Sequence, residues 1–479
     1  MEKNVLDGRW PLHGANKDKI TAILEDLEKD NIEWGKTAIL GFPSMKPHPI
    51  GLETFHKFQD LHTNALLTHT RGHGEKGFDG VKDIERDLIA MVADLLGDVR
   101  QDKQDKNANF DGYVTSGGTE ANIMGLWIGR NKLTHGELSK LDKRIAVLAT
   151  SASHYSLMKA CNVVGLGEGE WLYCQSCSDY NRNSKVNKLL AVKAGHIFRP
   201  AYDGSGLHFV KSNPDGSINL DSLELMIQHL RLTHKIDKFI IFLNQGTTLT
   251  GAMDDVAEIG KIISACKLKY SNQVSFYMHV DAAYGGLVYP FVLPDYPLVL
   301  SVPEVDSITI DPYKMGMCPI AEGIFICRKN LQFYIERRAG YVQNEMDDTL
   351  VGSRSGAYPA ACWSVFRTVG RSGFEEMHKA SVVKAQYLHT ELQTVDKIHL
   401  LPQQLNMVSF LLPADLSEDL IIKFEKHVIK KYYVMWSWFN TDPQNPESHP
   451  RMLVKCNITK DVKKQWLKNF IHDVKLYIN

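Results

Sequence analysis

Ser307-Ile308-Thr309-Ile310-Asp311-Pro312-Tyr313-Lys314-Met315-Gly316 decides the fold together with an earlier stretch, His279-Val280-Asp281-Ala282-Ala283-Tyr284-Gly285-Gly286. Each stretch begins as an apolar run rich in β-branched or aromatic residues and ends in polar residues, followed by small residues or a helix breaker. This pattern is typical of a buried strand that delivers side chains to the edge of an α/β sheet. The sequence therefore predicts two strand ends, one presenting Asp281 and the other Lys314.

A lysine amine beside a carboxylate suits a cofactor that carries a reactive carbonyl group. The amine of Lys314 can form a Schiff base with an aldehyde, and the acid of Asp281 can pair with a protonated pyridine nitrogen. Pyridoxal phosphate is the cofactor that needs both groups. Taken singly, Lys314 is more often a surface lysine and Asp281 a turn or helix cap, so the assignment depends on the other segments.

A candidate phosphate cradle lies upstream, in Tyr113-Val114-Thr115-Ser116-Gly117-Gly118-Thr119-Glu120-Ala121-Asn122. Here a short apolar run ends and a helix-like segment begins. Gly117 and Gly118 allow the backbone to approach an anion closely, and the following helix N-terminus offers free N–H groups. Ser116 and Thr119 can add hydroxyl donors. Alone, such a turn more often caps a helix than binds phosphate.

Two further strand ends carry candidate cofactor contacts, Ser153-His154-Tyr155-Ser156 and Asn244-Gln245-Gly246-Thr247-Thr248-Leu249-Thr250-Gly251. His154 can lie flat against a planar ring, or it can be an ordinary loop histidine. Thr248 can reach a ring oxygen or ring face, or it can simply satisfy the turn.

These four segments, in this order, resemble the pyridoxal-phosphate-dependent group II decarboxylases, a family that includes glutamate, histidine, tyrosine and aromatic amino-acid decarboxylases. Sphingosine-phosphate lyase is a related branch. The resemblance runs from about Pro43 to the C-terminus. The run Gly246 to Asp255 and the later Gly352-Ser353-Arg354-Ser355-Gly356 look most like bacterial histidine decarboxylases, archaeal-type tyrosine or aspartate decarboxylases, and the lyase branch. The resemblance implies an α/β fold of the aspartate-aminotransferase type (fold type I), with a mostly parallel sheet in the large domain and a smaller C-terminal α/β domain.

The resemblance also implies roles for single residues. Lys314 matches the Schiff-base lysine, and Asp281 matches the acid that keeps the pyridine nitrogen protonated. Ala283 then packs under the ring, His154 stacks on it, and Thr248 lies near the ring oxygen.

The phosphate would be held by Gly117, Gly118 and Thr119, with Ser307 as a further contact. One departure from the family is clear, because Tyr313 stands where a histidine usually precedes the lysine. A phenol can donate a hydrogen bond to phosphate, but it is bulkier and carries no positive charge.

The implied reaction is decarboxylation of an L-amino acid to the amine and carbon dioxide, through an external aldimine and a quinonoid. Family members often return the proton from a tyrosine on a loop after the lysine. Tyr341, within Arg338 to Glu345, is the candidate here, because Gly340 and the polar residues around it suit a lid. An ordinary loop tyrosine remains the alternative.

Two arginines are candidates for binding the substrate carboxylate, since guanidinium suits bidentate pairing with a carboxylate. Arg354 lies between serines and glycines, and can equally be a structural bridge between subunits. Arg451 lies on an expected late strand together with Lys455. The sequence favours an aromatic or histidine-type substrate.

Composition agrees with an intracellular enzyme. The 479 residues suffice for a large and a small domain, and the formal net charge of −1 indicates no general attraction to nucleic acid or membrane. No apolar run is long enough to span a bilayer, and the first residues lack the apolar core of a signal peptide. We therefore expect a cytoplasmic protein.

The eight cysteines are scattered, which suits reduced thiols. The spacing of Cys174 and Cys177 suits a metal, but no second pair follows, so no metal is predicted.

The expected organisation is an N-terminal arm (1–55), a large cofactor-binding domain (56–372) and a small domain (373–479). Polar residues from Gly167 to Lys188 are interpreted as an inserted surface loop. The resemblance implies a homodimer with its active site at the interface.

Two other functions remain open. A carbon–carbon lyase of the sphingosine-phosphate type would use the same lysine, but it would need a second phosphate site. A cofactor-binding protein without turnover would explain Tyr313 as drift from catalysis.

Overall fold

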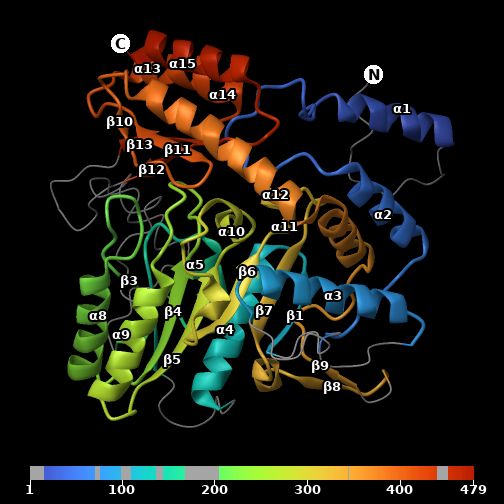
Figure 1. Ribbon diagram of the computed structural model, residues 1–479, viewed down its shortest axis with the longest axis vertical. Helices are drawn as coiled ribbons and strands as arrows, with labels where there is room; N and C mark the ends of the chain where they lie inside the picture. Colours follow the sequence, from blue (N-terminus) through green and yellow to red (C-terminus); the bar gives the residue numbers. More distant parts are fainter. Residues whose placement is uncertain are drawn as a thin grey trace.

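A seven-stranded sheet forms the centre of the larger part of the computed structural model, which describes residues 16–68, 70, 76–98, 109–135, 144–167, 204–342, 345–439 and 451–478 (Figure 1). The strand order is β1-β7-β6-β5-β4-β2-β3. Neighbouring strands run parallel except at β7, which pairs antiparallel with both β1 and β6. The bounds are β1 (Phe110–Thr115), β2 (Ile145–Ala149), β3 (Gly206–Phe209), β4 (Lys238–Asn244), β5 (Ser275–Asp281), β6 (Val305–Ile310) and β7 (Gly323–Arg328). The predicted α/β fold with a mostly parallel sheet is confirmed.

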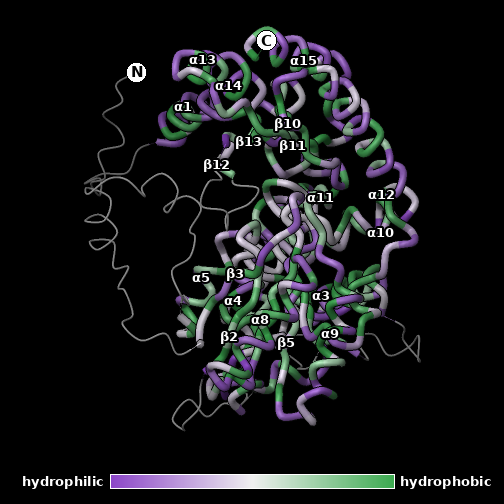
Figure 2. The backbone as a smooth tube through the Cα atoms, turned by 90° about the vertical axis from the view of Figure 1, so that its left-hand side faces the viewer, coloured by the Kyte–Doolittle hydropathy of each residue, from purple (hydrophilic) through white to green (hydrophobic). Residues whose placement is uncertain are grey.

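Helices cover both faces of this sheet, and β4 at its centre is apolar on both sides. In β4, Phe239 and Ile241 pack into a core shared with α3, α8 and α9, whereas Ile240 and Phe242 pack with α4 and α5. Successive strand residues point to opposite faces, so a doubly covered strand must be apolar throughout. The covering helices mix hydrophilic and hydrophobic residues along their length (Figure 2). Their bounds are α3 (Asp79–Leu95), α4 (Gly118–Thr134), α5 (Ser156–Val163), α8 (Leu220–Thr233) and α9 (Val256–Lys269).

The register of the central strands brings the two quoted stretches together. Asn244 of β4 lies beside Asp281 of β5, and Asp281 lies beside Thr309 of β6. The chain leaves β6 directly into α11 (Pro312–Met315), which carries Lys314. Other short helices of this region are η2 (Gly285–Leu287), α10 (Tyr289–Val292), η3 (Val299–Ser301) and η4 (Leu331–Tyr334).

A second, antiparallel sheet has the strand order β10-β11-β13-β12 and its own apolar core. The long helix α12 (Ala357–Leu392) joins the two parts and is interrupted at Gly370, whose φ is 65°. The expected domain division at residue 373 falls just after this point and stays a prediction. The bounds are β10 (His399–Leu400), β11 (Met407–Leu411), β12 (Met435–Phe439), β13 (Arg451–Asn457), α13 (Glu418–Phe424), η5 (Glu425–Ile429), α14 (Lys430–Tyr432) and α15 (Lys464–Ile478).

The N-terminal segment contains α1 (Lys17–Glu28) and α2 (Pro49–Asp60) and then runs along both parts of the molecule. Leu40 belongs to the core of the small sheet, and its N–H donates to the carbonyl of Tyr432 at 2.9 Å. The N–H of Met45 donates to the carbonyl of Lys314 at 2.9 Å. This part of the expected arm therefore packs against its own chain.

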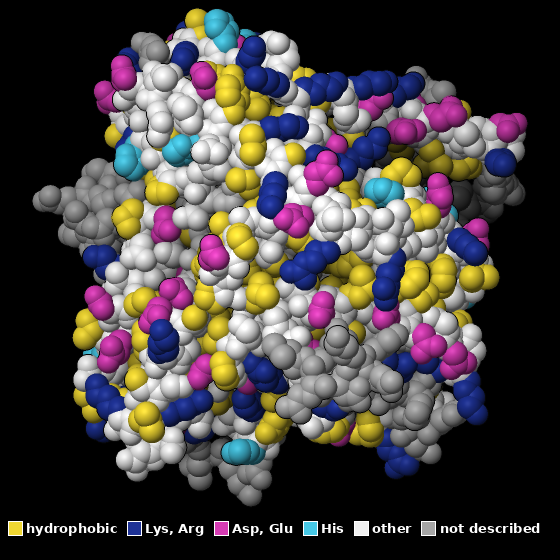
Figure 3. Space-filling view, in the orientation of Figure 1, with side chains coloured by type: hydrophobic (Ala, Val, Ile, Leu, Met, Phe, Trp, Pro, Cys, Tyr) yellow, Lys and Arg dark blue, Asp and Glu magenta, His cyan; other side chains and the backbone are white. Residues whose placement is uncertain are grey.

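The molecule's remaining strands, β8 (Arg337–Ala339) and β9 (Glu345–Asp347), form a small antiparallel hairpin. Acidic and basic side chains are interspersed over the face shown in Figure 3. Among the described residues, no helix combines the length and the apolar character that crossing a membrane requires.

Candidate active site

A cavity of about 340 Å³ lies at the carboxyl ends of β4 and β5 and reaches residues of β12 and β13 in the small sheet. In open α/β sheets this edge is where ligands bind. Most of the residues that the sequence predicts as cofactor contacts line this cavity: Gly117, Gly118, Thr119, His154, Thr248, Asp281, Ala283, Tyr313 and Lys314. Their convergence agrees with the sequence, whereas their roles toward a cofactor stay predictions.

The N-terminus of α4 opens into the cavity. Gly117 precedes the helix with a φ of 147°, a conformation that favours glycine, and a Cβ added there would meet no atom within 4 Å. Gly118 lies so close to Asp311 that a Cβ would come within 2.8 Å of its carboxylate. The positive end of a 17-residue helix dipole thus lies at the cavity, which suits a phosphate group.

Lys314 forms an ion pair with a carboxylate that the sequence analysis did not assign. Its Nζ lies 2.9 Å from Oδ2 of Asp311, which is only 2% exposed. Burial opposes the charge on Lys314, but Asp311 and the other nearby acidic groups outweigh burial and raise the pKa of the lysine. The second oxygen of Asp311 has no hydrogen-bond partner among the described residues. The pair therefore keeps Lys314 fixed and charged in this state.

Asp281 is held in place by hydrogen bonds from neighbouring residues. Asn122, in the first turns of α4, donates from Nδ2 to Asp281 Oδ2 at 2.8 Å and to Ser156 Oγ at 2.9 Å. The N–H of Ala283 donates to the other oxygen of Asp281 at 3.0 Å. Asp281 is thus fixed in orientation and keeps further acceptor capacity for a group in the cavity.

The support behind Asn122 extends to three more buried side chains. Because Asn122 donates through Nδ2, its Oδ1 accepts from His279 Nε2 at 2.9 Å. The other ring nitrogen, Nδ1, then accepts from Ser307 Oγ at 2.7 Å, and Ser307 Oγ accepts from Tyr277 OH at 2.7 Å. Burial lowers the pKa of His279 to about 4, so the imidazole is neutral. Every donor in this chain points toward Asp281.

This arrangement corrects the interpretation of Ser307. The sequence places Ser307 near the phosphate, but its side chain is fully buried within the sheet and its hydroxyl is occupied by His279 and Tyr277. Ser307 does not line the cavity. The error lies in the position along the strand. Ser307 is in the middle of β6, where side chains on either face are covered, and not at the strand end that opens into the cavity.

His154 lies at the cavity with a defined tautomer. The N–H of Ser156 donates to Nδ1 at 3.3 Å, and Ser156 Oγ lies 2.8 Å from the same nitrogen. The proton of the neutral ring is therefore on Nε2. Burial lowers the pKa of His154, and the positive charge of Lys314 contributes to this shift. A neutral, oriented imidazole suits stacking on a planar ring.

Lys455 is a second cation in the cavity, which the sequence analysis noted on its strand but did not assign. It is fully buried on β13, with its Nζ 3.6 Å from Met435 Sδ and 5.8 Å from the centre of the Tyr284 ring. Within the described part of the chain, no carboxylate forms an ion pair with it. Burial, and then the charge of Lys314, lower its pKa to about 7. The sequence signal that could have identified Lys455 as a site residue is its position within a mostly apolar, buried strand.

Neither predicted arginine reaches the cavity. The Arg354 side chain is 8% exposed and joins Glu85 at 2.8 Å, with further hydrogen bonds to the carbonyls of Val114 and Leu67 at 2.7 Å each. These contacts make it a structural bridge within its own chain. Arg451 donates from Nε to the carbonyl of Leu412. It lies four residues from Lys455, or about 13 Å along an extended strand, so it cannot share that site.

The structure does not bring Tyr341 to this cavity either. The side chain is 88% exposed in the turn between β8 and β9. A catalytic role for Tyr341 would require this turn to reach the cavity of another subunit. The expected insertion at 167–188 and the Cys174–Cys177 pair lie outside the described residues, apart from Gly167.

The cavity fits the cofactor that the sequence predicts. It offers an anion site at the start of α4, a fixed carboxylate in Asp281, and a primary amine in Lys314. These are the groups needed for a phosphate, a pyridine nitrogen and an aldehyde, respectively.

Comparisons with known proteins agree with the site. Residues 192–412 match the model of the pyridoxal-dependent decarboxylase conserved domain. The chain is 27% identical to a tryptophan decarboxylase of Clostridium sporogenes, over 95% of this chain and 94% of that protein. It is 28% identical to an L-aspartate decarboxylase of Thermococcus kodakarensis, over 84% of this chain and 86% of that protein. The crystal structure of L-methionine decarboxylase from Streptomyces sp. 590 superposes with a TM-score of 0.74 at 18% identity, covering 98% of this chain and 97% of that one.

Proposed function

We propose that this chain, in which residues 192–412 match the pyridoxal-dependent decarboxylase conserved domain, decarboxylates an L-amino acid with an acidic side chain, aspartate or glutamate. The similarity to named decarboxylases supports a pyridoxal-phosphate-dependent carboxy-lyase. The choice of an acidic substrate is the further step, and one observation carries it: Lys455 is a buried cation in the cavity without a carboxylate partner among the described residues.

The bound cofactor supplies an electron sink for the carbon from which the carboxylate leaves. In our proposal Lys314 holds the cofactor covalently, and Asp281 pairs with its pyridine nitrogen. The start of α4 binds the phosphate, with the Tyr313 hydroxyl as a neutral donor in place of the family's usual histidine. His154 and Ala283 enclose the ring.

The hydrogen-bond chain behind Asp281 has a definite task. Its donors, from Tyr277 OH through His279 to Asn122, all favour a negative charge on Asp281. A fixed carboxylate of this kind holds a proton on the pyridine nitrogen without reorganising during the reaction. Asn122 and His279 are therefore positioning residues that act through Asp281.

Asp311 accepts the proton that Lys314 must lose. An ammonium group is not a nucleophile, so Nζ must lose a proton before it can bind the cofactor covalently. Asp311 Oδ2, 2.9 Å away, is the acceptor in place. Burial raises the pKa of Asp311, which favours its acceptance of that proton.

Lys455 suits the distal carboxylate of the substrate better than the α-carboxylate. The α-carboxylate loses its charge as carbon dioxide forms, so a cation bound to it stabilises the ground state more than the transition state. A distal carboxylate keeps its charge throughout, and its binding contributes equally to both states. A substrate carboxylate would also supply the counter-charge that the buried ammonium lacks. The aromatic or histidine-type preference drawn from the sequence stays the alternative, since the similar proteins include a tryptophan decarboxylase as well as an L-aspartate decarboxylase.

Amine formation from single amino acids tests the proposal. The purified protein with added pyridoxal phosphate is supplied separately with L-aspartate, L-glutamate, L-tyrosine, L-tryptophan and L-histidine, and amine and carbon dioxide are both measured. We expect an acidic substrate to give equal amounts of both. An aromatic amine or histamine would contradict the role of Lys455, and no amine from any of them would favour the lyase or the silent cofactor binder.

We further propose that the active form is a homodimer. No residue of α1 is buried, and Ile20, Leu24 and Leu27 form an exposed apolar stripe at helical spacing. A second copy of the chain is the partner that the stripe suits, since Leu40 and Met45, further along the segment, already contact their own chain. Light scattering should give twice the chain mass, and Leu24→Glu should weaken the dimer. A monomeric wild-type protein with full activity would contradict this.

A further inference from the structure

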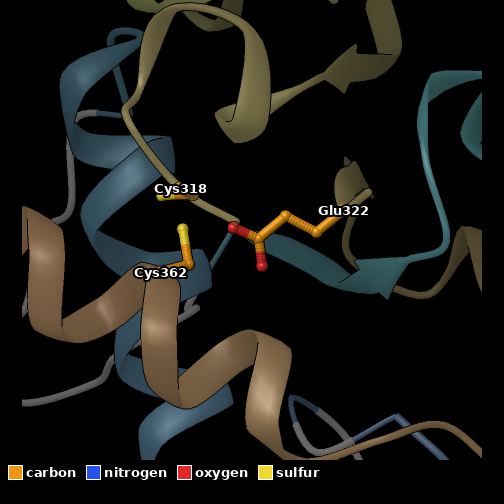
Figure 4. Close-up of side chains that lie close together, drawn as sticks. All are labelled: Cys318, Glu322 and Cys362. Atoms are coloured by element: carbon orange, nitrogen blue, oxygen red, sulfur yellow. The ribbon is translucent and has the colours of Figure 1, made fainter. Parts of the chain in front are cut away.

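A compact cluster of metal-ligating side chains lies outside the cavity, formed by Cys318, Glu322 and Cys362. Cys318 and Glu322 belong to the segment between α11 and β7, and Cys362 lies in the first turns of α12. Their ligand atoms all lie within 4.8 Å of one another. Figure 4 shows the carboxylate of Glu322 and the two sulfur atoms converging from different elements.

The cluster is completely enclosed, with Glu322 and Cys362 at 0% exposure and Cys318 at 1%. Neither oxygen of Glu322 has a hydrogen-bond partner of normal geometry among the described residues. The Cys318 thiol, a weak donor, is the polar group that interacts with it. The described residues place no lysine, arginine or histidine in an ion pair with Glu322, and the nearby charged group is another acid, Asp311. A buried carboxylate in this position lacks the compensation that such groups normally require.

We propose that Cys318, Glu322 and Cys362 bind a divalent thiophilic cation, with zinc as the ion that the ligands fit. Zinc takes cysteine sulfur and carboxylate oxygen together, whereas magnesium and calcium prefer oxygen alone. Binding replaces the protons of the two thiols and of the carboxyl group, and it supplies the partner that both oxygens of Glu322 lack; the Cys318 thiol, which otherwise donates to the carbonyl of Gly316 at 3.4 Å, becomes a ligand as well.

The alternative is a neutral cluster in which all three groups stay protonated. Burial supports this alternative in the absence of metal, since it raises the pKa of Cys362 to about 11 and those of Cys318 and Glu322 well above their usual ranges. The two states differ in one testable respect. A protonated glutamic acid can be replaced by glutamine with little loss, whereas a metal-binding carboxylate cannot.

The position of the cluster indicates what the ion would do. Cys318 follows the α11 helix that carries Lys314, and Ala321, between the two ligands of that segment, lines the cavity. Cys362 lies on the helix that continues into the small sheet. An ion here would fasten the segment after Lys314 to α12, and would thus stabilise one wall of the cavity without touching a substrate.

Metal content and thermal stability of the full chain test the site. The protein is purified without a polyhistidine tag, under reducing conditions, and its zinc is measured by mass spectrometry after dialysis. We expect about one zinc per chain in the wild type, loss of that zinc in Glu322→Gln and Cys362→Ser, and retention in the matched control Cys266→Ser, a buried cysteine on α9. Glu322→Gln should also lower the melting temperature.

Cobalt substitution provides a readout that needs no variant to fold. Wild-type protein from which any zinc has first been removed with a chelator, and which is then titrated with Co²⁺, should develop the near-ultraviolet absorption of thiolate-to-metal charge transfer. Absence of that absorption and of zinc, with Glu322→Gln melting like the wild type, would establish the neutral cluster and overturn the proposal. Zinc that remains in both ligand variants would also overturn it, because the ion would then be bound elsewhere.

Discussion

Two lysines line the same cavity, and their surroundings are opposite. Lys314 comes from the edge of the large sheet, where Asp311 pairs with it at 2.9 Å. Lys455 comes from β13 of the small sheet, where the described residues offer it a thioether and an aromatic ring but no carboxylate. The first cation is matched by the protein itself, and the second is left for a ligand to match.

The difference appears in how readily each lysine keeps its proton. Burial opposes the charge of both, but carboxylates reverse its effect at Lys314, where the pKa is raised, whereas at Lys455 the pKa falls to about 7. The role of each lysine is therefore set by its neighbours and not by its residue type. The large sheet brings acidic residues to its edge beside Lys314, whereas the small sheet contributes an apolar wall around Lys455.

The largest expected effect is the loss of covalent cofactor binding in Lys314→Ala. Of the two described lysines that line the cavity, Lys314 is the one beside an acid that can take its proton, so we expect borohydride reduction to fix the cofactor on Lys314 in the wild type and on no residue in the variant. Turnover should be lost entirely. Peptide mass spectrometry locates the label, with Lys455→Met as the matched control that should still be labelled at Lys314. A label on Lys455 would show that Lys455, and not Lys314, binds the cofactor covalently.

The second expected effect is selective loss of activity toward acidic substrates in Lys455→Met. Methionine has a similar length and no charge, so the variant removes one charge-assisted contact, worth about 1.5–3 kcal/mol. This corresponds to a decrease of about 10- to 150-fold in kcat/KM for aspartate or glutamate. Cofactor content should not change. An equal decrease for all amino acids would mean that Lys455 acts on a group common to every substrate.

The lowered pKa of Lys455 predicts how KM depends on pH. The free enzyme loses the cation as pH rises through about 7, so KM for an acidic substrate should rise above that pH, by about tenfold per unit at the limit. Arginine stays protonated over this range, so Lys455→Arg should abolish the dependence. A KM that is constant from pH 6 to 9 in the wild type would show that Lys455 does not bind the substrate.

Lys455 should also lower the stability of the protein without substrate. The unfolded chain keeps this proton up to its usual pKa of 10.5, whereas the folded protein releases it near 7. Between these values the unfolded state binds more protons, so the free energy of unfolding rises with pH. Lys455→Met should therefore be more stable than the wild type by an amount on the order of a few kcal/mol at pH 6, and the difference should shrink toward pH 10. Urea denaturation at both pH values measures it, and a constant difference would contradict the shifted pKa.

The comparison also separates what the sequence could predict from what it could not. Asp281 ends β5, and Lys314 follows the end of the adjacent β6 by four residues; a strand end followed by a breaker is visible in sequence. The fold follows from the same signals, because buried strands such as β4, which is apolar on both faces, alternate with helices. These features are local, so one sequence contains them.

The corrections concern residues whose role depends on distant parts of the chain. The sequence around Arg354 is typical of a site residue, but its guanidinium forms an ion pair with Glu85, far earlier in the chain. Ser307 differs from a phosphate contact only in its position along β6. Lys455 could not be chosen over Arg451 without the pairing of β12 with β13, which brings Met435 beside Lys455 and directs Arg451 to the other end of the strand.

The smallest effects are expected at the two residues that the sequence favours and the cavity lacks. Arg451→Gln and Tyr341→Phe should each change kcat/KM by no more than about twofold, as substitutions away from a site usually do. A loss of about 10²-fold in Tyr341→Phe would instead indicate proton transfer by this tyrosine. Since Tyr341 is 88% exposed and outside its own cavity, that proton would have to reach a partner subunit. Mixed dimers of Tyr341→Phe and Lys314→Ala would then regain activity, because one of their two cavities would combine an intact lysine with an intact tyrosine.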